Sequence, residues 1–452
     1  MTQLSAKKIP ASRIARLSHL GRVVGHVAGQ ALYQSSKQLL QGQAPSKRSV
    51  LLTPSNLQKL SDHLAQMRGA AMKVGQLLSM ESGELIPEEL SPILAQLRNQ
   101  GRSMPLAQLN RSLEQYWHKG WLEEFAYFSY QPIAAASIGQ VHKARTQQGE
   151  FLAIKVQYPG VRESINSDVD NLASLLKWSG LIPKSVDFSV ILSEAKLQLH
   201  EEANYVAESE FLNAYARALA GDHRFAVPEL NQQWSNENIL AMSFMEGEPI
   251  ESVQTLTQAQ RNAIMTHLFE LFFKELFEWQ MMQTDPNFAN YLYQADTQKI
   301  VLLDFGATRW LSKDLSAGYS ALIAAALEGD IKQITQALQD LNYLNESVTQ
   351  AVLAIMVEIV MLACEPLRFE EDYDFAQSDL PSRIRDLGMR LSLEQNYWHS
   401  PPLEVLLIHR KIAGLFLLAV RLKARVNLRQ VFQNIIHEPS SAKGEIDAEK
   451  PI

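Results

Sequence analysis

The spacing of apolar and polar residues predicts a helical beginning, a mixed middle and a helical end. Apolar residues recur at steps of three and four over 13–42, which predicts an amphipathic helix. Similar spacing over 56–80 and 88–117 predicts further helices. In the middle of the chain, apolar alternation between turn-forming residues is typical of strands. The pattern predicts strands at 127–130, 137–144, 151–157, 226–227 and 239–245, and helices at 161–178 and 186–218.

Beyond residue 255 the spacing is again mostly helical, with a short strand pair expected at 291–293 and 300–303. The residues after about 437 are too polar to form a packed element, so we expect this end to be disordered. The predicted parts are a basic amphipathic segment at 1–50, a helical extension at 51–120, a β-rich lobe with inserted helices at 121–245, a helical lobe at 246–437 and a disordered tail at 438–452.

Charge is distributed unevenly over the 452 residues. Residues 1–61 contain nine Lys and Arg and no acid, whereas the rest contains 33 basic and 49 acidic residues, a balance of −16. The acidic body argues against nucleic-acid binding, and the basic head predicts contact with an anionic membrane surface. The acid-free beginning also loosely resembles an organelle transit peptide. A peripherally membrane-associated cytoplasmic protein and a mitochondrial matrix protein are both compatible with this pattern.

The single cysteine and the apolar runs exclude some classes of protein. Cys364 alone can form neither an internal disulfide nor a cysteine-cluster metal site, and its apolar surroundings predict a buried, unreactive thiol. No stretch reaches the roughly 18 apolar residues that a membrane-spanning helix needs. The runs 351–364 and 412–420 are therefore predicted to be buried core helices.

A loop of small residues overlays the phosphate-covering loop of protein kinases, G-x-G-x-x-G-x-V, with alanine at the first two glycine positions. Glycine lets backbone amides approach phosphates closely, so alanine methyl groups should restrict this approach and stiffen the loop. The residues expected to contact a nucleotide here are Ala134, Ala135, Ala136, Ser137, Gly139 and Val141.

Further candidate site residues follow in the same order along the chain as in protein kinases. Lys155, in Ala-Ile-Lys, lies on the strand expected to hold the lysine that pairs with phosphate. A lysine between apolar neighbours needs a charged partner, and the best candidate is Glu208 on a later helix. At the next strand-to-loop junction, backbone groups of Ser243 and Met245 are expected to hydrogen-bond to adenine.

A second cluster of motifs supplies acids and an amide. Asp285 and Asn290 have the spacing of the kinase H-R-D-x-x-x-x-N loop, where the aspartate orients or deprotonates the acceptor and the asparagine binds metal. Here Gln-Thr precedes the aspartate in place of His-Arg. Asp304, in Asp-Phe-Gly, is expected to hold Mg²⁺ on the nucleotide phosphates. No A-P-E triplet follows, so a platform for peptide substrates is not evident.

In this combination the motifs resemble those of the UbiB/AarF/ADCK family, atypical protein-kinase-like proteins linked to ubiquinone (coenzyme Q) biosynthesis. The resemblance covers about residues 60–435, and Lys73-Val74-Gly75-Gln76 resembles the family's K-x-G-Q signature. Without C-terminal spanning helices, the chain is more similar to the mitochondrial-type members. Other runs that resemble the family lie at 134–137, 158–161, 164–168 and 283–287.

The resemblance implies an α+β, bilobal protein-kinase-like fold with a small β-rich N-lobe, a helical C-lobe and a helical N-terminal extension that covers the active site. Lys73 and Gln76 of the extension would point toward that site. Glu202 matches the first acid of an E-x-D element that contacts the extension, whereas Asn204 stands where the aspartate would be. The departure at Asn204 removes one of the two acids that the family element supplies.

The resemblance also implies ATP or ADP with Mg²⁺ as cofactors. It implies an anionic membrane surface, quinone-precursor lipids and ubiquinone-biosynthesis proteins as partners, and leaves a homodimer open. Three functions compete: an ATP-hydrolysing regulator of ubiquinone assembly, a true kinase of a protein or small molecule, and a nucleotide-gated binding module without catalysis. The filled positions Lys155, Asp285, Asn290 and Asp304 favour a catalytic function.

Overall fold

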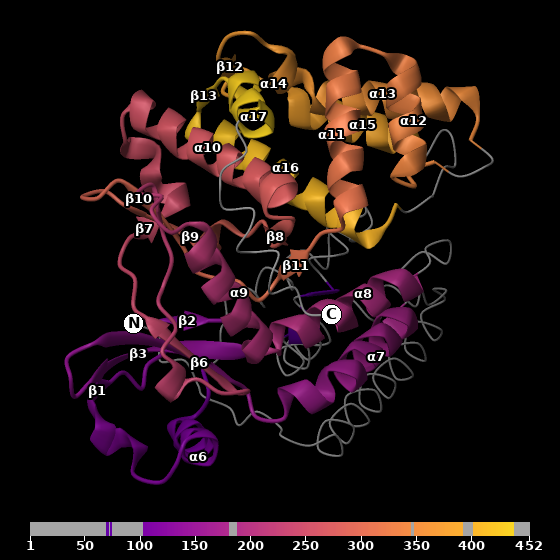
Figure 1. Ribbon diagram of the computed structural model, residues 1–452. Coiled ribbons are helices and arrows are strands. Elements are labelled where there is room, and N and C mark those ends of the chain that lie inside the picture. Colours follow the sequence, from indigo (N-terminus) through magenta and orange to yellow (C-terminus); the bar gives the residue numbers. More distant parts are fainter. Residues whose placement is uncertain are drawn as a thin grey trace, which may run out of the picture. The chain divides into compact units, whose positions relative to one another are not determined.

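The computed structural model describes residues 69–71, 73–74, 103–179, 188–344, 348–391 and 401–437. The chain divides into two compact units (Figure 1). We call Met1–Ser209 with Leu230–Phe244 the N-terminal unit, and Glu210–Glu229 with Met245–Ile452 the C-terminal unit. The predicted segment 1–50, most of the extension at 51–120 and the tail at 438–452 lie outside the described residues.

An antiparallel sheet forms the centre of the N-terminal unit, with the strand order β1-β3-β4-β6 and β2 paired to β3. The β3–β4 hairpin turns at Gly149, whose φ of +94° favours glycine. Six of the seven β4 residues are buried, which explains the nearly continuous apolar run in its sequence. The strands are β1 Phe125–Phe128, β2 Ala134–Ala135, β3 Gly139–Thr146, β4 Phe151–Gln157 and β6 Ile239–Ser243.

One aromatic-rich core packs on this sheet. Phe125 lies 4.6 Å from Trp234, and Trp121 lies 4.9 Å from Phe128, both measured between ring centroids. Helix α6 contributes Leu109 and Leu113, which are fully buried. The helices of this unit are α6 Leu106–Tyr116, η1 Trp121–Glu124, α7 Val161–Ser179, α8 Phe188–Glu202, the first residues of α9 Tyr205–Ala218, and η2 Gln232–Trp234.

The helical character predicted over 186–218 is confirmed, and it is divided between two helices, because α8 ends at Glu202 and α9 begins at Tyr205. Asn204 accounts for the break: its side-chain oxygen accepts a hydrogen bond from the Ala207 N–H at 3.2 Å, as an N-cap does. An asparagine in mid-helix favours such a local bond over the helical one, so a new helix starts here.

Short strands in the C-terminal unit hold its loops in place. One sheet has the order β5-β10-β9-β7, and two further pairs join β8 to β11 and β12 to β13. The pair predicted at 291–293 and 300–303 corresponds to β9 and β10, and the strand predicted at 226–227 corresponds to β5. The remaining strands were not predicted. The strands of this unit are β5 Phe225–Ala226, β7 Glu248–Pro249, β8 Met281–Gln283, β9 Tyr291–Gln294, β10 Lys299–Leu302, β11 Thr308–Trp310, β12 Tyr373–Asp374 and β13 Arg425–Val426.

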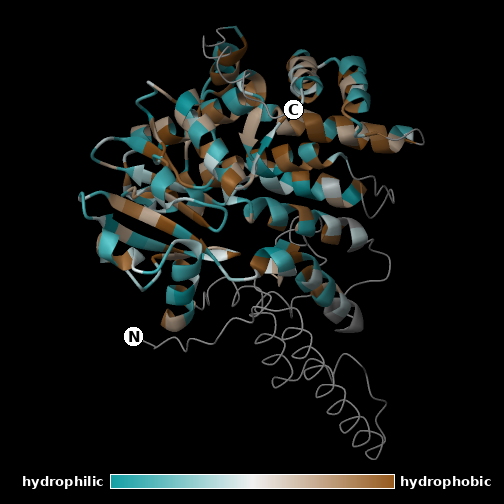
Figure 2. Cartoon of the chain, turned by 60° about the horizontal axis from the view of Figure 1, so that its bottom comes forward, coloured by the Kyte–Doolittle hydropathy of each residue, from teal (hydrophilic) through white to brown (hydrophobic). Residues whose placement is uncertain are grey.

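Helices make up most of the C-terminal unit. A capping box of Thr257 and Gln260 begins α10, which runs without interruption into the π-helical turn η4. Hydrophobic and hydrophilic residues alternate around most helices (Figure 2), as expected of helices that each bury one side. The helices are η3 Ile250–Thr255, α10 Gln258–Phe273, η4 Lys274–Glu278, η5 Phe288–Asn290, α11 Lys313–Glu328, α12 Ile331–Asp340, α13 Gln350–Ala363, α14 Glu365–Arg368, α15 Leu380–Met389, α16 Leu403–Leu422 and α17 Leu428–His437.

Within the described ranges, no helix combines the length and apolar character needed to cross a bilayer. The two apolar runs correspond to α13 and α16, and both are helices with many buried residues, in line with the prediction of core helices. Cys364 is buried, and burial raises the pKa of its thiol to about 12, which keeps it protonated and unreactive as expected.

Candidate active site

Lys155 and Glu208 form a buried ion pair in the N-terminal unit. The Lys155 Nζ lies 2.7 and 2.8 Å from the two carboxylate oxygens of Glu208. Glu208 is in the first turn of α9, where the helix dipole favours a negative charge. The ring of Tyr205 lies 5.1 Å from the same Nζ. The pairing expected for Lys155 is therefore present, over a separation of 53 residues.

The strand register places one other predicted contact, Val141, on the face of the sheet that carries Lys155. Val141 lies opposite Lys155, and Ala153 lies opposite Met242 on β6. Residues directly opposite each other on paired strands share a face, and so do residues two apart on one strand. Val141, Ala153, Lys155 and Met242 therefore form one surface. Ser243 ends β6 in this unit, whereas Met245 belongs to the C-terminal unit.

The small-residue loop is a tight β-turn structure rather than an open glycine loop. Ala134 and Ala135 pair with β3, and the Ala136 N–H donates to the Gly139 carbonyl at 2.9 Å. A Cβ atom on Gly139 would lie 2.5 Å from the Val156 carbonyl oxygen, so glycine is required at this position for packing. These hydrogen bonds close the loop, and its stiffness stays a prediction.

The described part of the extension contacts this loop through Glu202. The buried Lys73 Nζ lies 2.5 Å from one carboxylate oxygen of Glu202, and the Ser137 hydroxyl donates to the other. The helix turn at Gly69 approaches the Ser137 carbonyl so closely that a Cβ would lie 3.1 Å from it. Glu202 therefore joins Lys73 to the loop, whereas Gln76 lies outside the described residues.

Asp285 and Asn290 lie side by side in the C-terminal unit. The Asn290 Nδ2 donates to the Asp285 carboxylate at 3.2 Å, and the Asn287 N–H donates to the other carboxylate oxygen at 3.3 Å. The short η5 helix between them brings the asparagine back toward the aspartate. Because the Nδ2 of Asn290 donates to Asp285, the side-chain carbonyl oxygen of Asn290 is the atom that could bind a metal ion.

Backbone hydrogen bonds join this loop to the Asp-Phe-Gly segment. The Leu303 N–H donates to the Asn290 carbonyl at 3.0 Å, and both the N–H and the hydroxyl of Thr284 donate to the Ala307 carbonyl. Asp304 accepts from the Gly306 N–H at 3.0 Å, which closes the turn. The two predicted motifs thus form one hydrogen-bonded structure.

The side chains of this structure suit a magnesium ion. Asn290 and Asp304 line the same small pocket, and their amide and carboxylate oxygens are ligands that Mg²⁺ prefers. Among the described residues, no three His, Cys, Asp or Glu side chains form a metal-binding group. Phosphate and water oxygens would have to complete the coordination, as is usual for Mg²⁺.

A buried charge network behind the loop was not predicted. Lys411 on α16 pairs with Glu275 in the π-helical turn, and the other oxygen of Glu275 accepts from the Tyr215 hydroxyl at 2.5 Å. Tyr215 accepts in turn from the Gln283 N–H at 2.7 Å, and its ring lies 5.0 Å from that of Phe305. The one available signal was a lysine inside an apolar helical run.

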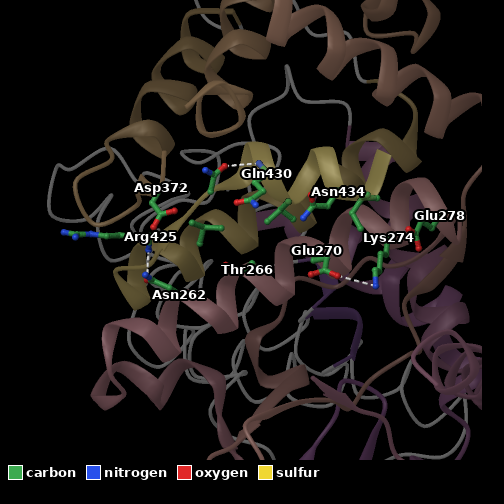
Figure 3. Close-up of a pocket in the computed structure, with 13 residues that line it drawn as sticks. Asn262, Thr266, Glu270, Lys274, Glu278, Asp372, Arg425, Gln430 and Asn434 are labelled. Atoms are coloured by element: carbon green, nitrogen blue, oxygen red, sulfur yellow. Dashed lines mark hydrogen bonds and ion pairs between the residues drawn. The ribbon is translucent and has the colours of Figure 1, made fainter. Parts of the chain in front are cut away.

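A second hollow of the C-terminal unit lies along α10 and α17 (Figure 3). One wall consists of residues at four-residue steps on α10 and η4, among them Thr266, Glu270 and Lys274. Glu270 and Lys274 lie 3.4 Å apart, and Gln430 of α17 also lines the hollow. None of the residues that line it is a predicted site residue.

Comparison with known proteins agrees with this arrangement. The profile of the ABC1 atypical kinase-like domain matches residues 96–338, more than half of the chain. The chain belongs to this family. The match includes every predicted site residue except Lys73 and Gln76, and it ends before Lys411.

Two relatives of this ABC1-family chain align over nearly its whole length. Atypical kinase COQ8, mitochondrial, of Saccharomyces cerevisiae is 35% identical over 435 residues, which cover 96% of this chain and 86% of the yeast protein. Atypical kinase COQ8B, mitochondrial, of Rattus norvegicus is 37% identical over 433 residues, with 95% and 82% covered. The expected UbiB/AarF/ADCK membership is confirmed.

A solved structure supports the fold. Rv3197 of Mycobacterium tuberculosis, determined in complex with erythromycin, has a TM-score of 0.57 and 24% identity, with 86% of this chain and 97% of that one covered. The expected α+β kinase-like fold, with a β-rich N-terminal part and a helical C-terminal part, is confirmed. The roles of individual site residues stay predictions.

Proposed function

We propose that the chain binds ATP with Mg²⁺ and transfers or hydrolyses its terminal phosphoryl group in coenzyme Q biosynthesis. The chain is an atypical kinase-like protein of that process, because relatives named atypical kinase COQ8 align over almost its whole length. The observation that carries the catalytic proposal is the buried pair of Lys155 and Glu208. A lysine held in this way is the usual partner of nucleotide phosphates in kinases.

The proposed division of roles follows from the contacts. Lys155 binds phosphate oxygens while Glu208 holds it in place, and the surface of Val141, Ala153 and Met242 receives the adenine. Backbone groups of Ser243 and Met245 supply adenine hydrogen bonds. Asn290 and Asp304 would hold Mg²⁺, and a bound ion would neutralise charge on the phosphates.

Asp285 acts at the attacking group. Water or an acceptor hydroxyl loses its proton to the Asp285 carboxylate while its oxygen bonds to the terminal phosphorus, and ADP leaves with the bond electrons. The hydrogen bonds from Asn290 and from the Asn287 N–H hold this carboxylate in one orientation. A fixed orientation supports its role, because proton transfer requires the base within hydrogen-bond reach.

The alanine loop and the extension would tune this activity. The hydrogen bonds of Ala134–Ala136 to β3 and the Lys73–Glu202–Ser137 contacts support a stiff loop in contact with the extension. Such a loop favours slow turnover coupled to lipid over rapid phosphorylation of peptides. The basic residues within 1–61 support attachment to an anionic membrane surface that carries quinone precursors. The mitochondrial names of the relatives support the matrix as an alternative location.

The test is phosphate release by the purified chain with Mg-ATP, with and without anionic liposomes. Asp304→Asn should reduce the release to background, because an amide is a poorer Mg²⁺ ligand than a carboxylate. Asp296→Asn in the β9–β10 turn is the matched control and should match the wild type. Equal release by the wild type and Asp304→Asn would contradict the proposal. Label transfer to an extract component, lost in Asp285→Asn, would instead favour a true kinase.

A further inference from the structure

The side chain of Gln283 is buried without a partner. The residue is only 5% exposed. Neither its Nε2 nor its Oε1 has a hydrogen-bond partner among the residues that the structure describes. A buried amide can donate twice and accept twice, and leaving these groups unpaired is unfavourable. An apolar side chain of the same size would avoid this cost, so the amide requires an explanation.

The main chain of Gln283 is firmly held. It ends β8, where it lies opposite Thr308 of β11. Its N–H donates to the Tyr215 hydroxyl at 2.7 Å, and Tyr215 is held by Glu275, which pairs with the buried Lys411. The direction of the amide is therefore set by its backbone and by this charge network, not by bonds of its own.

The amide lies where the proposed metal ligands are. Gln283 lines the same small pocket as Asn290 and Asp304, and it precedes Asp285 by two residues. A metal ion surrounded by carboxylate, phosphate and water oxygens offers acceptors for the amide N–H groups, and bound water offers donors for its oxygen. Groups that hydrogen-bond to the ligands of a metal orient those ligands and strengthen its binding.

We propose that Gln283 is a positioning residue of the magnesium–nucleotide site. On binding, its amide hydrogen-bonds to the oxygen ligands around the ion and so orients Asp304 and Asn290. The inference rests on the proposed function. It also gives a role to the Gln-Thr pair that stands in place of His-Arg: an uncharged amide positions the ligands at every pH, whereas a histidine would become a cation beside the ion.

The experiment measures Mg²⁺ affinity calorimetrically with saturating ADP, using the full chain without turnover. Gln283→Leu should weaken Mg²⁺ about tenfold, an effect typical for the loss of such a contact. Its unfolding temperature without ligand should stay equal or rise, because an unpaired buried amide is gone. Gln339→Leu, on the exposed side of α12, is the matched control and should change neither value.

Gln283→His provides a second readout that packing alone would not affect. Its Mg²⁺ affinity should fall as the pH drops through about 6.5, where imidazole gains a proton, while the wild type changes little. Gln283→Glu retains the size and should bind Mg²⁺ more tightly, which keeps the test decisive if the leucine variant does not fold.

The outcomes separate the two proposals. Equal Mg²⁺ affinity in the wild type and Gln283→Leu, together with a flat pH profile for Gln283→His, would show that Gln283 is only a core amide. A wild-type chain that binds no Mg·ADP would contradict the proposed function itself, and the inference with it.

Discussion

Lys411 and Glu275 form an ion pair in the interior of the C-terminal unit, with side-chain exposures of 3% and 1%. The two residues are 136 positions apart, on α16 and on the π-helical turn η4. Burial raises the pKa of Glu275 and lowers the pKa of Lys411. The charge of each residue and the hydrogen bond between them oppose both of these pKa shifts. The pair is stable as ions only because both members are present.

The pair matters because of what Glu275 holds. Its second oxygen accepts from the Tyr215 hydroxyl, and Tyr215 fixes the Gln283 N–H two residues before Asp285. A helix far along the chain thereby stabilises the loop that carries the proposed base. Glu275 is the second residue of the π-helical turn η4, which follows α10 without interruption.

Lys411→Met is therefore expected to destabilise the fold by about 3–5 kcal/mol, because Glu275 would remain buried without its cation. Urea unfolding of the full chain measures this change. Lys411→Met combined with Glu275→Leu should recover much of the loss, since no charge is then left unpaired. Lys332→Met on the exposed face of α12 is the control. A double variant no more stable than Lys411→Met would contradict the assignment.

Gly414, three residues after Lys411 on α16, also contacts the same loop. A Cβ atom at this position would lie 2.7 Å from the Cβ of Pro286, which directly follows Asp285. Gly414→Ala should therefore displace the loop, at a cost of roughly 1–3 kcal/mol from overpacking. Phosphate release should fall more than nucleotide affinity, because the base moves while the adenine surface is untouched.

The control for this variant is Gly388→Ala in α15, where an added Cβ meets nothing within 4 Å. It should leave phosphate release unchanged and stabilise the helix by up to about 1 kcal/mol. If Gly414→Ala behaves like Gly388→Ala in both assays, α16 does not constrain the position of Asp285.

The sequence predicts the residues of the site better than the buried residues that hold the site in place. The reason is physical. Asp285, Asn290 and Asp304 lie in short motifs whose spacing reflects local turns, so their proximity could be inferred from the chain alone. The pairing of Lys155 with Glu208 could be predicted, because in the kinase order of motifs a helix with an acidic residue follows the strand that carries the lysine. Lys411 and Glu275 lie in different helices that no motif connects, and a distant ion pair has no local pattern.

The fold shows the same limit. Strands with several residues, such as β3 and β4, alternate clearly enough to be predicted from sequence. β8, with three residues, is too short for a periodic signal and depends on its partner strand β11. The break between α8 and α9 depends on Asn204, whose capping bond competes with helix continuation only in its actual surroundings.

Glu208→Gln should destabilise the N-terminal unit by roughly 1–3 kcal/mol, because the buried Lys155 ammonium would lose the carboxylate whose two oxygens it contacts. Affinity for ADP should fall as well, since the Lys155 ammonium loses its fixed position. Thermal unfolding with and without Mg·ADP measures both effects. Glu210→Gln, exposed on the same helix, is the control. Unchanged stability in Glu208→Gln would refute an ionic pairing with Lys155.

His142 lies in a buried hydrogen-bond chain of the N-terminal unit that requires a neutral ring. The Met104 N–H donates to the Gln140 side-chain oxygen at 2.8 Å, and the Gln140 amide nitrogen lies 2.7 Å from the His142 Nε2. The Nδ1 lies 2.7 Å from the Ser129 carbonyl oxygen. With Met104 donating to its oxygen, Gln140 must donate to Nε2, so Nδ1 carries the proton and donates to Ser129.

Burial lowers the pKa of His142 below its usual value, and the Ser129 hydrogen bond only partly opposes this. The folded pKa is thus lower than the unfolded value of about 6.5. Stability from neutral His142 is complete above that pH and is lost as the pH falls through the folded pKa. Urea unfolding should show that the free energy of unfolding falls less between pH 8 and pH 5 in His142→Gln than in the wild type. The control is His223→Gln, which alters an exposed residue and should behave like the wild type. Parallel pH profiles in all three proteins would mean that protonation of His142 does not oppose folding.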